Sequence, residues 1–250
     1  MNYKLTLQYD GTDFFGWQIQ DDKRTVQGEL TRVLSLLEGR NVSVHGSGRT
    51  DAGVHALGQV ANVHLEKEFA TEKLRNAING NLDHDVRVIS VEVVPNDFHA
   101  RFSAKRKTYV YRIVNSQVMS PLWVRFAHQE SRALDIDGMR EAAHVFLGEH
   151  DWTAFSSAQA DASSRVRTIE RLGVKEFYDN WTNARVIEIT ASADGFLRYM
   201  VRTIAGTLLS KGRDEIELED IKDAIETGER KLEFVTAPAK GLTLFSVDYD

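Results

Sequence analysis

Cysteine is absent from all 250 residues of this sequence, and its absence excludes several kinds of site together. Disulfides, thiolate nucleophiles, zinc ribbons and iron–sulfur clusters all need cysteine side chains. Proline occurs only 3 times and there is no low-complexity tract, so no flexible linker is indicated. No apolar run is long enough to span a membrane, and no charged-then-apolar leader opens the chain. We therefore expect a cytoplasmic protein that does not associate with membranes.

Common nucleotide and metal motifs are missing as well. The chain has no Gly-x-x-x-x-Gly-Lys phosphate loop and no Gly-x-Ser-x-Gly nucleophile elbow. Gly46 and Gly48 lack the third glycine that a dinucleotide-binding fingerprint needs. The histidines never take the His-x-x-x-His spacing of a helical metal site. The sequence therefore predicts an enzyme or a binding module that uses neither a metal nor a cofactor.

Charge is unevenly distributed along the chain. The net charge is −6, yet residues 98–129 contain six basic residues and no acid. These basic residues are Arg101, Lys105, Arg106, Lys107, Arg112 and Arg125. A basic band on a nearly neutral body predicts a nucleic acid or another phosphate-bearing ligand. A solvated charged face would explain the same run without any ligand.

Apolar periodicity predicts an α/β organisation in each half of the chain. Residues 3–9 alternate as in a half-buried strand, and Thr25 and Gly39 bound a helix with one apolar stripe. Further strands are expected at 41–45, 86–94, 107–115 and 242–249, and another strand is expected to end near His64. A β-hairpin is expected over 167–193. Further helices are expected at about 72–79, from 137, and at 196–210 and 219–227. We predict two α/β lobes, residues 1–104 and 105–250.

The glycine-bearing loop 46–55 is the most informative stretch for chemistry. Arg49 and Asp51 lie two residues apart between its glycines. A guanidinium next to a carboxylate keeps that carboxylate ionised, ready to act as a nucleophile or a base. An aspartate that caps a turn and pairs with its neighbour would leave the same pattern. His55, at the end of the loop, is expected to pack the loop.

Longer strings resemble the tRNA pseudouridine synthase A family over essentially the whole chain. The string around the loop, GRTDAGVHA at 48–56, is similar to the central motif of that family. The other ordered matches are YDGTDFFGWQ at 9–18, DFHARFSA at 97–104 with KTYVY at 107–111, GEHDWTAF at 148–155, FLRYMVRTIAG at 196–206 and APAKGL at 237–242. Because these specific strings occur in the same order as in the family, an accidental resemblance is negligible.

The resemblance implies an activity, a substrate and a set of site residues. Members convert uridine to pseudouridine at positions 38, 39 and 40 of the tRNA anticodon stem-loop, and they act as homodimers without a cofactor. Asp51 matches the catalytic aspartate, which either attacks C1′ or removes the 2′ proton. Arg202 matches the basic residue that pairs with it, and Arg49 matches the arginine that helps to extrude the target nucleotide.

Tyr109 matches the active-site tyrosine of the family, and its ring would offer a stacking face to an everted uracil. A core aromatic on an alternating strand is the other explanation, and it fits Tyr111 better. Arg202 has an alternative as well, because Arg198 and Arg202 could form a wet helix face. Lys105, Arg106 and Lys107 are candidate phosphate contacts without base specificity.

We therefore predict an α+β protein with two ferredoxin-like α/β lobes, adjoining antiparallel sheets and a central basic cleft that binds tRNA. Two other functions are considered. A glycoside hydrolase would need a second carboxylate across the scissile bond, and the loop 46–55 contains only Asp51. A catalytically silent RNA-binding module would not need the acid at all.

Overall fold

The computed structural model describes residues 1–158 and 163–249, and the chain divides into two compact units. The first unit contains Met1–Lys105 and Thr243–Asp250, and the second contains Arg106–Leu242. The C-terminal strand belongs with the first unit because Thr243 and Leu244 pair with His55 and Ala56. The division that the sequence suggested at residue 105 did not include this return of the chain. Helices and mostly antiparallel strands in both units confirm the α+β class.

The first unit follows the strand–helix–strand–strand–helix–strand order of a ferredoxin-like lobe. Its central strand β1 pairs antiparallel with β3 on one side and β4 on the other. Two shorter pairings share the outer edge of β3, with β2 antiparallel at one end and β10 parallel at the other. The strands are β1 (Asn2–Tyr9), β2 (Val44–Gly46), β3 (His55–His64), β4 (Val86–Val94) and β10 (Leu242–Asp248).

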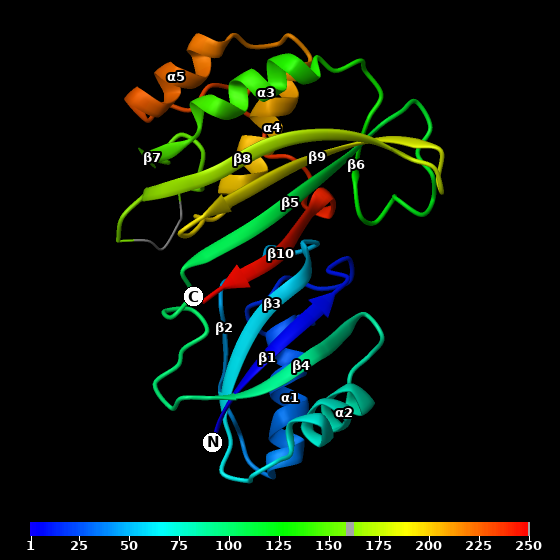
Figure 1. The fold of residues 1–250 in the computed structure, drawn as a ribbon, viewed down its shortest axis with the longest axis vertical. Helices are drawn as coiled ribbons and strands as arrows, with labels where there is room; N and C mark the ends of the chain where they lie inside the picture. Colours follow the sequence, from blue (N-terminus) through cyan, green and yellow to red (C-terminus); the bar gives the residue numbers. More distant parts are fainter. Residues whose placement is uncertain (159–162, 250) are drawn as a thin grey trace. The chain divides into compact units, whose positions relative to one another are not determined.

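Helices α1 (Val26–Glu38) and α2 (Thr71–Asn81) lie together on one face of this sheet (Figure 1). The Thr25 hydroxyl accepts from the Gly28 amide at the start of α1, and Gly39 ends the helix with φ at 83°. These are the two residues that the sequence pattern assigned to the ends, and the prediction is confirmed. The apolar stripe of α1 and one face of β1 supply the core: Tyr3, Leu5, Leu7, Leu30, Val33 and Leu34 are fully buried.

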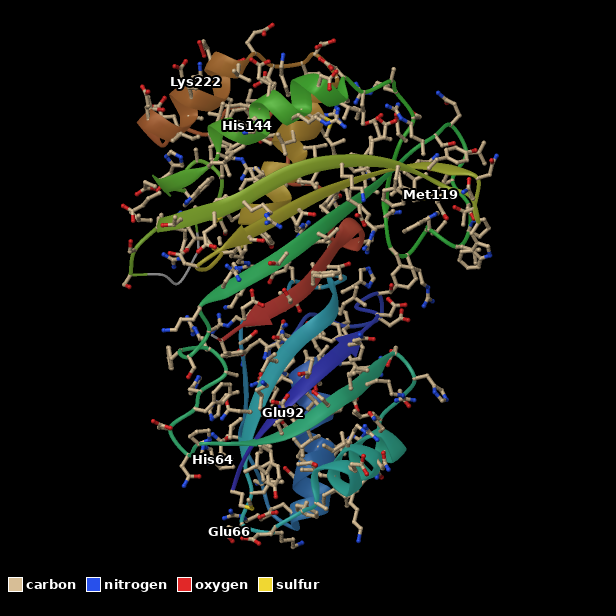
Figure 2. All side chains as sticks on the ribbon, viewed as in Figure 1. His64, Glu66, Glu92, Met119, His144 and Lys222 are labelled. Atoms are coloured by element: carbon tan, nitrogen blue, oxygen red, sulfur yellow. The ribbon has the colours of Figure 1, made fainter. Side chains whose placement is uncertain are left out.

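The second unit has strand order β5-β9-β8-β7, with every pairing in that order antiparallel. A short strand, β6, runs parallel to the far end of β5. Figure 1 shows its helices gathered on one face, and His144 and Lys222, labelled in Figure 2, are exposed residues of these helices. The elements are β5 (Arg106–Asn115), β6 (His128–Glu130), α3 (Ile136–Val145), β7 (Gly148–Asp151), β8 (Val166–Asp179), β9 (Ala184–Ala193), α4 (Met200–Gly212), α5 (Leu218–Thr227) and the 3-10 turn η1 (Ala239–Gly241).

An aromatic cluster fills the core of the second unit beneath its helices. The Phe146 ring lies 6.2 Å from Trp152 and 5.1 Å from Phe155, and Phe155 stacks on Phe234 at 5.2 Å. Trp152 and Phe155 are fully buried, so the sequence motif that contains them serves the core of this unit. Pairs of this kind stabilise a core beyond their buried area.

One sequence expectation about the second unit is wrong. The helix expected from residue 196 begins at Met200, because Tyr199 adopts a left-handed conformation with φ at 66°. A residue in that conformation cannot continue an α-helical hydrogen-bond ladder, so residues 196–199 form an irregular approach to α4. Apolar periodicity extends through this approach and gave no sign of the break.

Candidate active site

The loop that carries Asp51 connects β2 to β3 in the first unit and lies against the segment that follows β1. Two backbone hydrogen bonds join them: the Trp17 amide donates to the Thr50 carbonyl at 3.0 Å, and the Gly53 amide donates to the Phe14 carbonyl at 3.3 Å. The Val54 amide also donates to the Asp51 carbonyl at 3.1 Å, which closes a tight turn at Asp51 itself. The backbone of the acid is therefore held from both sides.

Two glycines allow this close approach. A Cβ at Gly16, where φ is +85°, would lie 2.5 Å from the Thr50 carbonyl oxygen. A Cβ at Gly11 would lie 2.0 Å from the Val54 carbonyl oxygen. Both distances are below any tolerated contact, so the string between Tyr9 and Trp17 needs glycine at these positions to press against the loop. This explains in physical terms why the opening string and the loop string occur together.

Buried polar side chains support the loop from beneath. The Tyr9 hydroxyl lies 2.8 Å from the Thr50 hydroxyl, and the Ser47 hydroxyl donates to Gln59 Oε1 at 2.7 Å. Gln59 Nε2 donates to the Gly48 carbonyl at 3.1 Å. Burial raises the pKa of Tyr9 to about 12, so its phenol stays neutral and keeps this hydrogen bond at ordinary pH. A satisfied buried network of this kind fixes one loop conformation.

His55 packs the loop, as the sequence suggested. Its side chain is buried, and its Nδ1 accepts a hydrogen bond from the Gly11 amide at 3.0 Å. The imidazole therefore ties the first residue of β3 to the segment that braces the Asp51 loop. That prediction is confirmed.

In the second unit, Tyr109 lies on β5 with only 8% of its surface exposed. Its ring meets the Phe196 ring edge to face, with centroids 5.3 Å apart and an interplanar angle of 90°. Tyr111, two residues on, is fully buried and donates its hydroxyl hydrogen to the Pro238 carbonyl at 3.0 Å. Burial also raises the pKa of Tyr111. Tyr111 is thus a core tyrosine, as expected from the sequence, and Tyr109 beside it is also buried.

Arg202 lies in the first turn of α4 and is half-buried. Its Nε donates to the Ala237 carbonyl at 2.8 Å, while the Ala237 amide donates to the Arg202 carbonyl at 3.0 Å. Its guanidinium lies 5.1 Å from the centre of the Tyr199 ring. Arg198 precedes the helix, so the interpretation of both arginines as one wet helix face is wrong. The bond to Ala237 fixes the plane of the Arg202 guanidinium.

The remaining candidates are surface residues. Arg49, Lys105 and Arg106 are exposed and Lys107 is half-buried. Arg106 pairs with Glu170 at 3.3 Å. Asp51, Arg49 and Lys105 belong to the first unit, whereas Tyr109, Arg202, Arg106 and Lys107 belong to the second.

Sequence reasoning missed the residues that position the site. Tyr9, Thr50, Phe196 and Tyr199 touch predicted site residues or their loop, yet no spacing rule points to them. Their positions inside the matched strings were the only signal. Among residues 1–158 and 163–249, no group of three or more metal-ligating side chains is placed to hold an ion. No helix in the same ranges is long and apolar enough to cross a bilayer.

Comparison with known proteins agrees with the matched strings. Residues 6–103 and 142–250 match the model of the tRNA pseudouridine synthase family. The tRNA pseudouridine synthase A of Afipia carboxidovorans is 42% identical over 248 residues, covering 99% of both chains. Proteins of the same name from a Bacillus species and from Thermodesulfovibrio yellowstonii are 41% and 38% identical, over at least 99% of each chain. This chain therefore belongs to the tRNA pseudouridine synthase family.

Proposed function

We propose that this chain isomerises uridine to pseudouridine at positions 38, 39 and 40 of the tRNA anticodon stem-loop. Isomerisation of tRNA uridine follows from membership of the family, and the three positions are the finer proposal. The observation that carries the proposed isomerisation is the Asp51 loop. Its backbone is held by the close approach of Gly11 and Gly16 and by buried polar side chains, while Asp51 itself is partly accessible. A structural turn aspartate would not need such support.

Asp51 acts on the ribose, either by attack on C1′ or by removal of the 2′ proton. The bond from C1′ to N1 of uracil breaks, the base rotates, and C5 bonds to C1′. This last step releases Asp51 from C1′ if the acid attacked there, and Asp51 returns the proton to C2′ if it removed one. C5 then loses its proton and N1 gains one, so substrate and product have the same composition. No electrons enter or leave, which means that the reaction itself requires neither an oxidant nor a reductant.

The other candidate residues have supporting roles in this proposal. Arg202 is the basic residue that acts with Asp51, and the bond from its Nε to the Ala237 carbonyl sets the direction of the guanidinium. Arg49 helps to extrude the target nucleotide. Tyr109 stacks on the extruded uracil, and its edge contact with Phe196 holds the ring in place.

The activity can be tested directly on an unmodified anticodon stem-loop transcript with uridine at the three positions. We expect stops in carbodiimide-dependent primer extension at those positions after incubation with the protein, also with EDTA present once the RNA has been folded. Free uracil and an abasic ribose would instead identify a glycoside hydrolase. Tight binding with no change in the RNA would identify a silent RNA-binding module.

Charge reversal at Lys105, Arg106 and Lys107 is expected to raise the dissociation constant for tRNA and to flatten its salt dependence. Each lost phosphate contact should lower the slope of log K against log salt by about one. Arg106 already pairs with Glu170 at 3.3 Å, so its contact with RNA would compete with that ion pair. Filter binding over a salt series measures the slope, with Lys222→Glu on α5 as the control. An unchanged slope would place the cluster away from the RNA.

We also propose that the chain works in the cytoplasm as a homodimer. Residues 1–104, joined by the returning strand β10, then carry the catalytic aspartate, and the rest of residues 105–250 contributes to RNA binding. Sedimentation equilibrium should give twice the chain mass of 28.3 kDa. A monomer at micromolar concentration would contradict the dimer without affecting the proposed reaction.

A further inference from the structure

The turn at residues 98–103, directly after β4, has a backbone that is fixed by buried side chains. Asn2 Nδ2 donates to the Phe98 carbonyl at 2.9 Å, and Asn62 Oδ1 accepts from the Ala100 amide at 2.9 Å. The Tyr249 hydroxyl donates to the Ala100 carbonyl at 2.7 Å. Both asparagines are 1% exposed, so these bonds are protected from competition by water. The turn is therefore a rigid part of the first unit.

This rigid turn holds a large apolar side chain out in solvent. Phe102 is 77% exposed, although its backbone neighbours are firmly anchored. Its ring centroid lies 4.4 Å from that of His99, which in turn lies 5.0 Å from that of His45 on β2. The Arg101 guanidinium lies 5.6 Å from the Phe102 ring. We call His45, His99, Arg101 and Phe102 the Phe102 platform.

The chemistry of the platform fits a nucleotide. Burial, and then the charges of His45 and Arg101, lower the pKa of His99, so its ring is a neutral plane at pH 7. The turn opens the stretch of residues 98–129, which has six basic residues and no acid. An exposed aromatic ring next to a guanidinium in a basic stretch is what an unpaired base and its phosphate bind.

A protein partner fits less well. Docking of an apolar protein surface needs a contiguous apolar patch, whereas the neighbours of the Phe102 ring are imidazoles and a guanidinium. A base stacks on a single ring, and its phosphate pairs with the adjacent arginine. The charge complementarity therefore favours RNA over a protein.

We propose that the Phe102 platform binds an unpaired nucleotide of the tRNA, with the base stacked on Phe102 and the phosphate paired with Arg101. The identity of the RNA as tRNA rests on the proposed function. The platform supplies affinity and takes no part in the chemical step. Its loss should therefore appear in binding and in KM, while the single-turnover rate at saturating enzyme stays within about twofold of wild type.

Three variants test the proposal against a matched control. Phe102→Ala should raise the Kd for unmodified tRNA about fivefold to a hundredfold without changing the salt slope, because stacking releases no counterions. Arg101→Gln should raise Kd and lower the slope by about one. Trp181→Ala, which removes an 80% exposed aromatic from the second unit, should leave both quantities unchanged.

Phe102→Trp supplies a fluorescence signal that would not change if Phe102 had only a structural role. The variant should keep Kd within about threefold of wild type, and tRNA should quench more of its fluorescence than in the wild type, because a stacked base quenches indole emission. A Phe102→Ala Kd within twofold of wild type, or no extra quenching in Phe102→Trp, would overturn the platform. A fall in the saturated single-turnover rate with unchanged Kd would also overturn it.

The same experiments separate this inference from the proposed function. Wild-type protein that forms pseudouridine while all Phe102 variants bind like wild type would refute the platform alone. Wild-type protein that binds tRNA through Phe102 but forms no pseudouridine would refute the proposed function and leave the platform standing.

Discussion

Replacement of Asp51 by asparagine is expected to lower the rate of pseudouridine formation by at least about a thousandfold, with tRNA affinity nearly intact. Loss of a reacting group in other enzymes costs this much or more. Asparagine keeps the size of the side chain but cannot ionise, so it can neither attack C1′ nor accept the 2′ proton. Affinity should persist because it comes mainly from phosphate contacts.

The backbone contacts that hold the loop do not depend on the Asp51 side chain. The contacts that hold the loop use the carbonyl groups of Thr50 and Asp51 and the amide of Gly53, and none of these changes with the side chain. The Tyr9 to Thr50 bond beneath the loop is also untouched. Thermal denaturation of the variant measures whether the unit keeps its stability, and with the stability kept the lost rate can be assigned to the carboxylate.

Single-turnover rates and Kd on one anticodon stem-loop measure the two quantities separately. Asp21→Asn removes a charge from an exposed turn of the same unit and should leave both unchanged. Asp51→Ala should be as inactive as Asp51→Asn. Residual activity within tenfold of wild type in either variant would remove Asp51 from the catalytic role.

Tyr109→Ala is expected to slow the reaction about tenfold to a hundredfold, while Tyr109→Phe retains most of the rate. Base stacking on an aromatic ring contributes about 1–3 kcal/mol, and each 1.36 kcal/mol of barrier is tenfold in rate. Phenylalanine keeps the flat ring and its edge contact with Phe196, and alanine loses both. The ring, rather than the hydroxyl, would then be the functional group.

Loss of the Phe196 contact could also loosen the fold, so the melting temperature must be measured for both variants. Tyr178→Ala, at an exposed position on β8, is the control and should be silent in rate. Equal and near-complete loss in Tyr109→Phe and Tyr109→Ala would contradict stacking. It would assign a proton-transfer role to the hydroxyl instead.

Local elements of this protein were determined by the sequence itself. The ends of α1 depend on a hydroxyl at Thr25 and on a residue at position 39 that tolerates positive φ, and both signals act within one turn of the chain. Strand β1 and the β8–β9 hairpin follow from alternation and a polar turn. The matched strings likewise gave the family and the candidate Asp51, because a motif records residues and spacing.

Pairings between distant segments were decided only by the tertiary structure. No local pattern shows that Thr243 pairs with His55, because the whole second unit separates the two strands along the chain. The same holds for the close approach of Gly16 to the Thr50 carbonyl and for the hydrogen bond between the Tyr9 and Thr50 hydroxyls.

The start of α4 and the exposure of Phe102 belong to this second group. Periodicity predicts an apolar residue to be inside and a helix to continue. Tyr199 departs from the helical conformation where the guanidinium groups of Arg198 and Arg202 lie near its ring. Buried asparagines hold the turn that exposes Phe102. Local propensity is worth a few tenths of a kcal/mol per residue, so contacts made only in the folded chain outweigh it at these positions.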